Sequence, residues 1–187
     1  MLGGEHTVSA GAFRALRDNF YDCGVVQFDA HSDLRDTYFG GSLSHACVMR
    51  RGLDMGLRIF QIGVRSLSLE EHVLRNESPS VGFLDAAEIH ARGVPEKLLP
   101  DDFPPRIYVT FDVDGLDPST IPATGTPEPG GLSWQHAMAM LEMLSREREI
   151  VGADFVELAP VAGLHAPDFA VARLAYNFMG FMSRKRR

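Results

Sequence analysis

Residues 106–118 read RIYVTFDVDGLDP, an apolar run that leads directly into clustered acids. The run RIYVTF is rich in β-branched and aromatic residues, which predicts a strand. A second stretch, GVVQFDAHSD at residues 24–33, repeats the arrangement with a continuous apolar run. Such runs are typical of strands buried on both faces of a parallel sheet. The two stretches therefore favour an α/β fold.

Outward from these stretches, apolar periodicity predicts alternating strands and helices. The expected strands lie at residues 24–28, 57–64, 81–86, 106–111 and 150–159. The expected helices lie at residues 9–19, 44–56, 68–76, 133–149 and 167–182. Ser68 followed by Glu71 is a capping-box pattern, which marks a helix start. The alternation predicts a three-layer α/β/α fold with a mainly parallel sheet, and the length predicts a single domain over residues 1–187.

The composition is that of a globular protein with an acidic balance. The 187 residues include 18 Lys and Arg and 25 Asp and Glu, which gives a formal charge of −7. Nucleic-acid binding needs a basic face, so we expect no nucleic-acid partner, and we read the basic end at residues 183–187 as a favourable charge at a helix C-terminus. No apolar run reaches the ~18 residues of a membrane span, so we expect no membrane partner. Without a secretory signal, Cys23 and Cys47 are interpreted as buried thiols of a cytoplasmic protein.

Acids and a histidine follow the ends of three predicted strands. They are Asp29, His31 and Asp33 after one strand, Asp112 and Asp114 after another, and Glu157 in a third segment. Ligands of open parallel sheets bind beyond the carboxyl ends of the strands, so we expect these residues to converge on one crevice. We also expect an extended backbone there, because side chains at alternate positions of an extended chain point the same way.

Four carboxylates in one crevice predict a bound cation, because they would otherwise repel one another and take up protons. Carboxylates with one or two imidazoles form a hard, oxygen-rich ligand set, which favours Mn²⁺, with Mg²⁺ and Fe²⁺ as alternatives. So many anionic ligands can hold two ions ~3.5–4 Å apart, bridged by a carboxylate and a water. A single Asp after a strand is more often a turn former or a helix cap. Two such clusters in one chain favour the metal site.

Five sequence blocks resemble the signature blocks of the ureohydrolases, the family of arginase, agmatinase and formiminoglutamase. In chain order they are GGEH, FDAHSDLRD, SHACVMRR, TFDVDGLDPSTIPATGTPEPGGLSW and DFVELAP. The resemblance implies an arginase-like parallel α/β sheet and a binuclear manganese centre with two Mn²⁺ per chain. The implied ligands are His6 and Asp33 at one ion, His31 and Asp114 at the other, and Asp29 and Asp112 bridging both. It also implies that His45 shuttles protons at the mouth and that Glu157 orients the guanidinium.

The same resemblance implies manganese-dependent hydrolysis of a guanidino compound by a hydroxide that bridges the two ions. Residues 33–51, DLRDTYFGGSLSHACVMRR, are more similar to the agmatinase branch than to arginase. Agmatine, hydrolysed to putrescine and urea, is therefore the leading substrate, with arginine, guanidinobutyrate and formiminoglutamate as alternatives. The expected partner is a small cationic guanidino substrate, and family members are usually homo-oligomers.

Relatives normally carry a long segment before GGEH, so the resemblance implies an N-terminally truncated form of the fold. The strand leading to Glu157 is then expected at an open edge of the sheet, and His6 is expected to lack the strand that fixes its backbone. The alternative function is an inactive truncated fragment with an incomplete metal site. A related metal-dependent deacylase is disfavoured, because such enzymes usually hold one Zn²⁺ whereas six ligands suit two ions.

Overall fold

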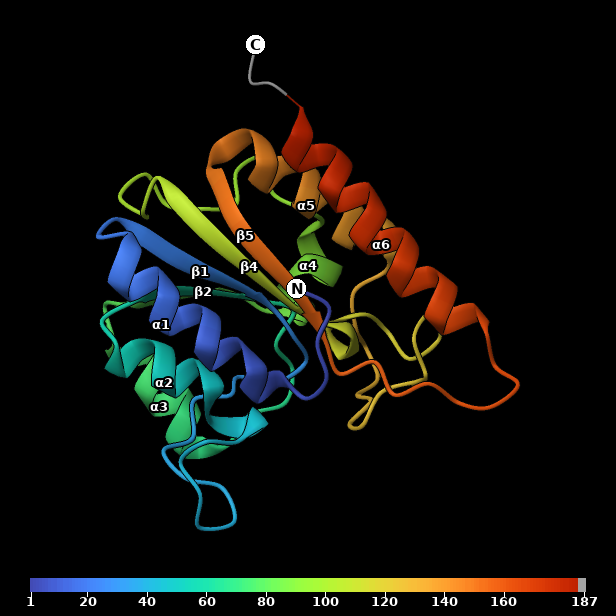
Figure 1. Ribbon diagram of the computed structural model, residues 1–187, viewed down its shortest axis with the longest axis horizontal. Helices are drawn as coiled ribbons and strands as arrows, with labels where there is room; N and C mark the ends of the chain where they lie inside the picture. The colour runs from blue at the N-terminus through green and yellow to red at the C-terminus, as the bar shows by residue number, and fades with distance from the viewer. Residues whose placement is uncertain (185–187) are drawn as a thin grey trace.

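The computed structural model describes residues 1–184, and its centre is a five-stranded parallel sheet (Figure 1). The strands are β1 (Cys23–Phe28), β2 (Arg58–Ile62), β3 (Val81–Leu84), β4 (Arg106–Asp112) and β5 (Glu149–Val156). Their order across the sheet is β3-β2-β1-β4-β5, and every pairing is parallel. The predicted parallel α/β sheet is thus confirmed. Residues 185–187 of the basic end lie outside the described residues.

Helices cover both faces of the sheet and complete three layers. They are α1 (Ser9–Asn19), α2 (Val48–Asp54), α3 (Leu69–Glu77), α4 (Ala86–Arg92), α5 (Trp134–Glu147) and α6 (Ala166–Ser183). Figure 1 shows α1, α2 and α3 on one face and α4, α5 and α6 on the other. Consecutive strand residues face opposite layers, so Val25 packs in a core with Phe13 of α1, whereas Val26 packs in a second core with Leu141 and Phe178.

The structure also differs from the predicted elements at several ends. The sequence does not predict α4, whose seven residues are too few for a clear periodic pattern. The helix expected from residue 44 begins at Val48, after a short 3-10 turn. The capping box is confirmed, because the Ser68 hydroxyl accepts from the Glu71 N–H and the Glu71 carboxylate accepts from the Ser68 N–H. β5 ends at Val156 because the next residue has a left-handed backbone.

β5 lies at an edge of the sheet, as expected, but the first residues of the chain pair with part of it. The N–H of Gly3 donates to the carbonyl of Phe155 (3.0 Å), and the N–H of Phe155 donates to the carbonyl of Met1 (3.1 Å). Residues 1–4 form an isolated bridge and no strand, as expected, but their hydrogen bonds hold the backbone before His6, which corrects the expectation that it is left unfixed. Residues 1–4 run along β5 and deliver His6, which is fully buried, to the ends of the strands.

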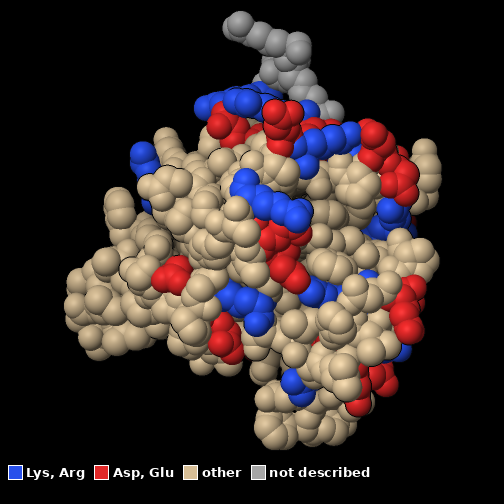
Figure 2. Space-filling view, turned by 180° about the vertical axis from the view of Figure 1, so that it is seen from behind, with Lys and Arg blue, Asp and Glu red and all other residues tan. Residues whose placement is uncertain are grey.

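The surface and the cysteines give little further constraint on function. Figure 2 shows Lys and Arg side chains mixed with Asp and Glu over the face opposite that of Figure 1. Among the described residues, no helix combines the length and apolar character needed to cross a membrane. Cys23 and Cys47 are both free thiols, and both are buried, as expected.

Candidate metal centre

The predicted residues gather where three neighbouring strands end. Phe28 of β1 is in register with Phe111 of β4, so Asp29 and Asp112 follow side by side. β5 pairs with β4 on its other side and brings Glu157 to the same edge. Of the six predicted metal ligands, all but His31 are buried. The convergence expected from the strand ends is what the structure shows, whereas the roles of the individual residues stay predictions.

The backbone reaches this arrangement by turning, which corrects the expectation of an extended chain. Asp33 has a left-handed backbone with φ 54°, and residues Val113–Gly115 form a 3-10 turn. The Asp112 carboxylate accepts a hydrogen bond from the N–H of Asp114 (2.9 Å), and Asp29 accepts one from His31 (2.7 Å). Beyond the sheet, the backbone N–H groups have no neighbouring strand to donate to. A short Asp side chain provides an acceptor for the N–H of the residue two positions later. These turns aim the carboxylates at one another.

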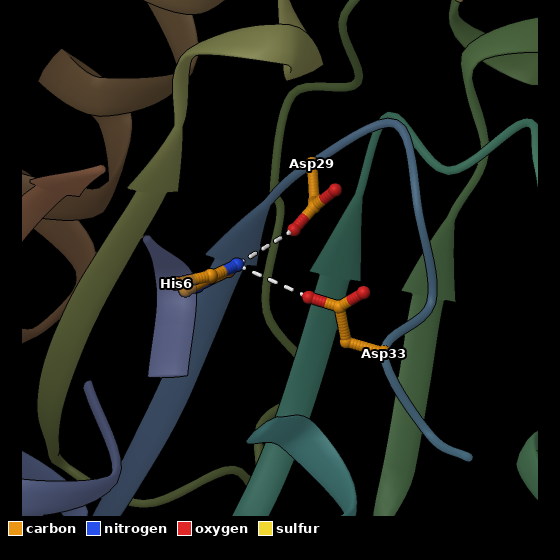
Figure 3. A group of neighbouring side chains, drawn as sticks. All are labelled: His6, Asp29 and Asp33. Atoms are coloured by element: carbon orange, nitrogen blue, oxygen red, sulfur yellow. Dashed lines mark ion pairs between the residues drawn. The ribbon is translucent and has the colours of Figure 1, made fainter. Parts of the chain in front are cut away.

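Two groups of ligand atoms share Asp29. In the first group, Nδ1 of His6 lies 3.1 Å from Oδ2 of Asp33 and 3.2 Å from Oδ2 of Asp29 (Figure 3). In the second, Nδ1 of His31 lies 3.1 Å from Oδ2 of Asp114 and 3.5 Å from Oδ1 of Asp29. Within each group the potential ligand atoms lie within 4.8 Å of one another. Asp29 therefore presents one oxygen to each group.

The metal-free arrangement is electrostatically unfavourable. Burial raises the pKa of Asp33 to about 8, and the negative charge of Asp29 adds to the effect. Burial also raises the pKa of Asp112 well above its usual value, with the charges of Asp29 and Asp114 acting in the same direction. Burial lowers the pKa of His6, but the carboxyl groups of Asp112, Asp29 and Asp33 outweigh it and raise that pKa well above its usual value. Divalent cations would offset this crowding of negative charge.

The residues present fit such cations. Nδ1 of His6 is buried and has no hydrogen-bond partner among the described residues, although oxygens of three carboxylates surround it at 3.1 to 3.4 Å. A buried polar atom without a partner is unfavourable, and an imidazole nitrogen facing carboxylates is a ready metal ligand. Oxygen-rich sets with one imidazole suit hard divalent ions. Each of the two groups would therefore suit a divalent ion, and Asp29 belongs to both groups.

Sequence reasoning missed three side chains that support this cluster. Nε2 of Gln27 donates to Oδ2 of Asp29 (2.8 Å), and Nε2 of Gln61 donates to Oε1 of Gln27 (2.6 Å). The half-buried guanidinium of Arg65 donates to the carbonyl of Asp114 (2.8 Å). Gln27 interrupts the apolar run GVVQF, and Gln61 interrupts RIFQI. A polar residue inside a buried strand was the available signal, because it must find a partner there.

A cavity of about 440 Å³ opens above the acidic cluster. Four predicted ligands line it, namely His31, Asp33, Asp112 and Asp114. Other lining residues are Glu5, Arg35, Tyr38, His45, Ala46, Ser66, Leu67, Ser68, Glu71, Gly125, Thr126 and Glu157. Both predicted catalytic residues thus face the same space as the candidate ligands, which leaves room there for a small molecule.

His45 and Glu157 differ in how they are held. Nδ1 of His45 lies 3.1 Å from Oε1 of Glu5, and its side chain is 44% exposed. Glu157 accepts a hydrogen bond from the N–H of His6 (2.6 Å), and burial raises its pKa although that N–H opposes the shift. Its backbone φ is 64°, a conformation that is rare for residues other than glycine and costs energy. Such strain is concentrated at functional sites.

Comparison with known proteins assigns the family. The family model described as Arginase family matches residues 1–180. The chain belongs to the arginase family. It is 36% identical over 188 residues to the N(1)-aminopropylagmatine ureohydrolase of Synechocystis sp., covering 100% of this chain and 61% of the relative. It is 34% identical over 183 residues to the agmatinase of Pyrococcus horikoshii, covering 98% and 62%.

Solved structures agree with the assignment. The agmatine ureohydrolase of Thermoplasma volcanium matches with a TM-score of 0.81 and 37% identity, over 97% of this chain and 61% of that one. The formimidoylglutamase of Bacillus subtilis matches with a TM-score of 0.87 and 25% identity, over 97% and 60%. This arginase-family chain thus spans about 60% of the length of each of these four relatives. The family is one of binuclear metal enzymes, and the two ligand groups described above fit that property.

Proposed function

We propose that this arginase-family chain carries out the metal-dependent hydrolysis of a guanidino compound, with agmatine to putrescine and urea as the leading reaction. The observation that carries the proposal is the pair of His–Asp groups that share Asp29 beneath a cavity of about 440 Å³. The names of the relatives, agmatinase and N(1)-aminopropylagmatine ureohydrolase, support a guanidino substrate. Arginine, guanidinobutyrate and formiminoglutamate are the alternative substrates.

The cavity suits a guanidinium group. A guanidinium is planar and cationic, so a carboxylate can accept two parallel hydrogen bonds from it. Glu157 supplies such a carboxylate in the cavity wall, and its carboxyl group is already held by the N–H of His6. Arg35 is the only Lys or Arg among the lining residues, whereas the acidic side chains there are several. We propose that Glu157 orients the guanidinium over the candidate metal ligands.

Two Mn²⁺ ions are the proposed cofactors, because the ligand set is hard and rich in oxygen. The proposed ligands are His6 and Asp33 at one ion, His31 and Asp114 at the other, and Asp29 at both. Asp112 belongs to neither of the two groups, but its Oδ2 lies 3.4 Å from Nδ1 of His6, and we propose it as the second carboxylate shared by the ions. When bound, the ions supply Lewis-acid activation of a water molecule near neutral pH. The side chains of this chain would hold the ions beside the cavity, which four of the proposed ligands line, and the remaining space would be left to the substrate.

We propose His45 as the residue that delivers a proton to the leaving amine. The Glu5 carboxylate beside Nδ1 orients the ring, and the exposed position lets the ring regain a proton from solvent. Replacing His45 by asparagine is expected to lower kcat about 100-fold, because positioned general acids contribute that much. The metal content should stay at the parent value, since His45 is not one of the six proposed ligands. Steady-state kinetics with metal analysis on the same sample checks both expectations.

His72→Asn is the matched control for that variant. His72 lies exposed on α3, remote in sequence from the ligand groups, so kcat should not change. An unchanged kcat in His45→Asn, or a loss of bound metal, would contradict the assigned role.

The proposed function is tested by urea release from agmatine with added Mn²⁺, with bound metal counted on the same sample. Urea release with two ions per chain supports the proposal. Two bound ions without urea from agmatine, arginine or guanidinobutyrate, and without formamide from formiminoglutamate, would overturn the activity while keeping the metal centre. Fewer than two ions and no urea would favour the alternative, an inactive truncated fragment with an incomplete site.

We also propose that the protein acts as a homo-oligomer in the cytoplasm. Three large apolar side chains on α6 support association, because they are mostly exposed: Phe169 (73%), Tyr176 (63%) and Met179 (58%). The free, buried thiols of Cys23 and Cys47 support a reducing compartment. A light-scattering mass of one chain would contradict the oligomer.

A further inference from the structure

A buried hydrogen-bonded network lies behind His6, on the ring nitrogen that points away from the candidate metal ligands. Nε2 of His6 lies 2.8 Å from Oγ1 of Thr110, and the Thr110 hydroxyl donates to Oδ1 of Asp154 (2.6 Å). The other carboxylate oxygen of Asp154 accepts from the hydroxyls of Ser9 and Tyr108, at 2.8 Å each. Four of these side chains are fully buried, and Tyr108 is 6% exposed. Neither the predicted metal site nor the proposed catalytic residues account for this network.

The donors and acceptors of the network determine where its protons lie. A carboxylate can only accept, and a hydroxyl has one proton to give. Ser9, Tyr108 and Thr110 each give that proton to Asp154. Burial and the neighbouring Asp154 raise the pKa of Tyr108, so its hydroxyl remains a donor. The 3.4 Å contact between the hydroxyls of Ser9 and Thr110 therefore has no proton left to share.

The same assignment of donors and acceptors determines which ring nitrogen of His6 carries a proton. Oγ1 of Thr110 has given its proton away, so it can offer His6 only a lone pair. Nε2 must then carry a proton to make the 2.8 Å hydrogen bond. Nδ1, on the opposite side of the ring, is the nitrogen left to face Asp29 and Asp33. Its lone pair is what a metal ion needs from a neutral imidazole.

We propose that Asp154 and Thr110 are positioning residues that hold a proton on Nε2 of His6 and thereby reserve Nδ1 for a metal ion. Metal-binding histidines generally donate their other N–H to an acceptor, and losing that acceptor typically weakens metal binding. Here the Asp154 carboxylate does not contact His6 directly, and it acts on the ring through the Thr110 hydroxyl. The proton placement stands on the network alone, and only its effect on metal affinity rests on the proposed function.

Two variants remove the network in different ways. Thr110→Val keeps the shape of the side chain but removes the acceptor for Nε2. Asp154→Asn does more, because its amide oxygen can still accept from Ser9 and Tyr108 while its NH₂ donates to Thr110. The Thr110 hydroxyl then turns its own proton toward His6, and Nε2 must lose its proton to accept it. Both variants are expected to bind Mn²⁺ about 10- to 100-fold more weakly than the parent.

Two further variants separate positioning from packing. Thr110→Ser keeps the hydroxyl, so its Mn²⁺ affinity should return to within about threefold of the parent, well inside the loss expected for an outer ligand. Tyr108→Phe removes one donor to Asp154 but leaves the path from Asp154 through Thr110 to His6 intact. It is expected to lower thermal stability without changing Mn²⁺ affinity. Equal losses of affinity in Tyr108→Phe and Thr110→Val would show a packing defect and overturn the proposal.

The protonation of Nε2 is measured in the metal-free protein labelled with ¹⁵N-histidine, at a pH high enough for the His6 ring to be neutral. Burial lowers the pKa of His6, but the carboxyl groups of Asp112, Asp29 and Asp33 outweigh it and raise that pKa well above the usual value. Long-range ¹H–¹⁵N spectra should show a protonated Nε2 for His6 in the parent, and Asp154→Asn should lose it. An unprotonated Nε2 in the parent overturns the proposal. So does parental Mn²⁺ affinity in both Thr110→Val and Asp154→Asn. If the parent binds no metal, the proposed metal centre fails, and the spectra still decide where the proton lies.

Discussion

Replacing Asp112 by asparagine is expected to abolish urea release from agmatine and to leave the metal-free protein at least as stable as the parent. The amide keeps the shape of the side chain, and its oxygen can still accept from the N–H of Asp114. It removes a negative charge that faces Asp29 and that both proposed ions require. The loss is expected to be at least about 1000-fold in kcat/KM, equivalent to about 4 kcal/mol of transition-state stabilisation. Bound metal should fall below two ions per chain.

The stability half of that expectation follows from the crowding of carboxylates. Burial and the charges of Asp29 and Asp114 raise the pKa of Asp112, so its ionised form is unfavourable in the folded, metal-free protein. A neutral amide at position 112 avoids that cost. Denaturant unfolding in the presence of a chelator measures the free energy of unfolding of the variant and the parent. Asp36→Asn, which removes a charge from an exposed surface residue, is the control. Full activity with two bound ions in Asp112→Asn would rule out the proposed bridging role.

Replacing Phe111 by alanine is expected to lower the free energy of unfolding by about 3–5 kcal/mol, the usual cost of truncating a buried Phe. Phe111 is fully buried at the centre of a row of rings that crosses the sheet. Its centroid lies 4.9 Å from that of Phe28 and 5.8 Å from that of Phe155, which in turn contacts Phe178 of α6. Truncation leaves a cavity that the neighbouring strands cannot close. Urea denaturation of the chelated protein gives the difference directly.

Tyr21→Ala supplies the control for the Phe111 substitution. Tyr21 lies between α1 and β1 and is 98% exposed, so its truncation should change stability by no more than about 0.5 kcal/mol. A loss below 1 kcal/mol in Phe111→Ala would mean that the row of rings contributes little to the core.

Much of the fold could be predicted because local patterns and tertiary packing agree. The helix at residues 9–19 has the predicted bounds, and Ser68 and Glu71 form the predicted capping box. Prediction failed where the deciding interaction is not local. α4 has only seven residues, and its start after Asp85 depends on packing against the sheet. β5 ends where Glu157 adopts a left-handed backbone. The strand propensities of the residues do not predict such a conformation for a glutamate.

The meeting of the candidate residues at one end of the sheet could also be predicted, but not their geometry. Asp29 and Asp112 follow apolar runs in the sequence, which was sufficient to place them at one end of the sheet. The turns that aim them depend on hydrogen bonds made after the sheet ends. The position of His6 depends on the pairing of residues 1–4 with β5, a contact between opposite ends of the chain. Local sequence patterns cannot predict a contact between residues that lie so far apart in the chain.

The sharing of Asp29 between the two ligand groups would make the binding of the two proposed ions thermodynamically linked. An ion bound in one group would offset part of the negative charge of Asp29. The affinity of the other group for its ion would then change. Linkage is reciprocal, so the second ion must alter the binding of the first by the same factor. A titration with Mn²⁺ should therefore give two unequal steps in place of two independent and equal ones. The half-loaded protein is then a distinct chemical species, whose population depends on how much free metal surrounds it.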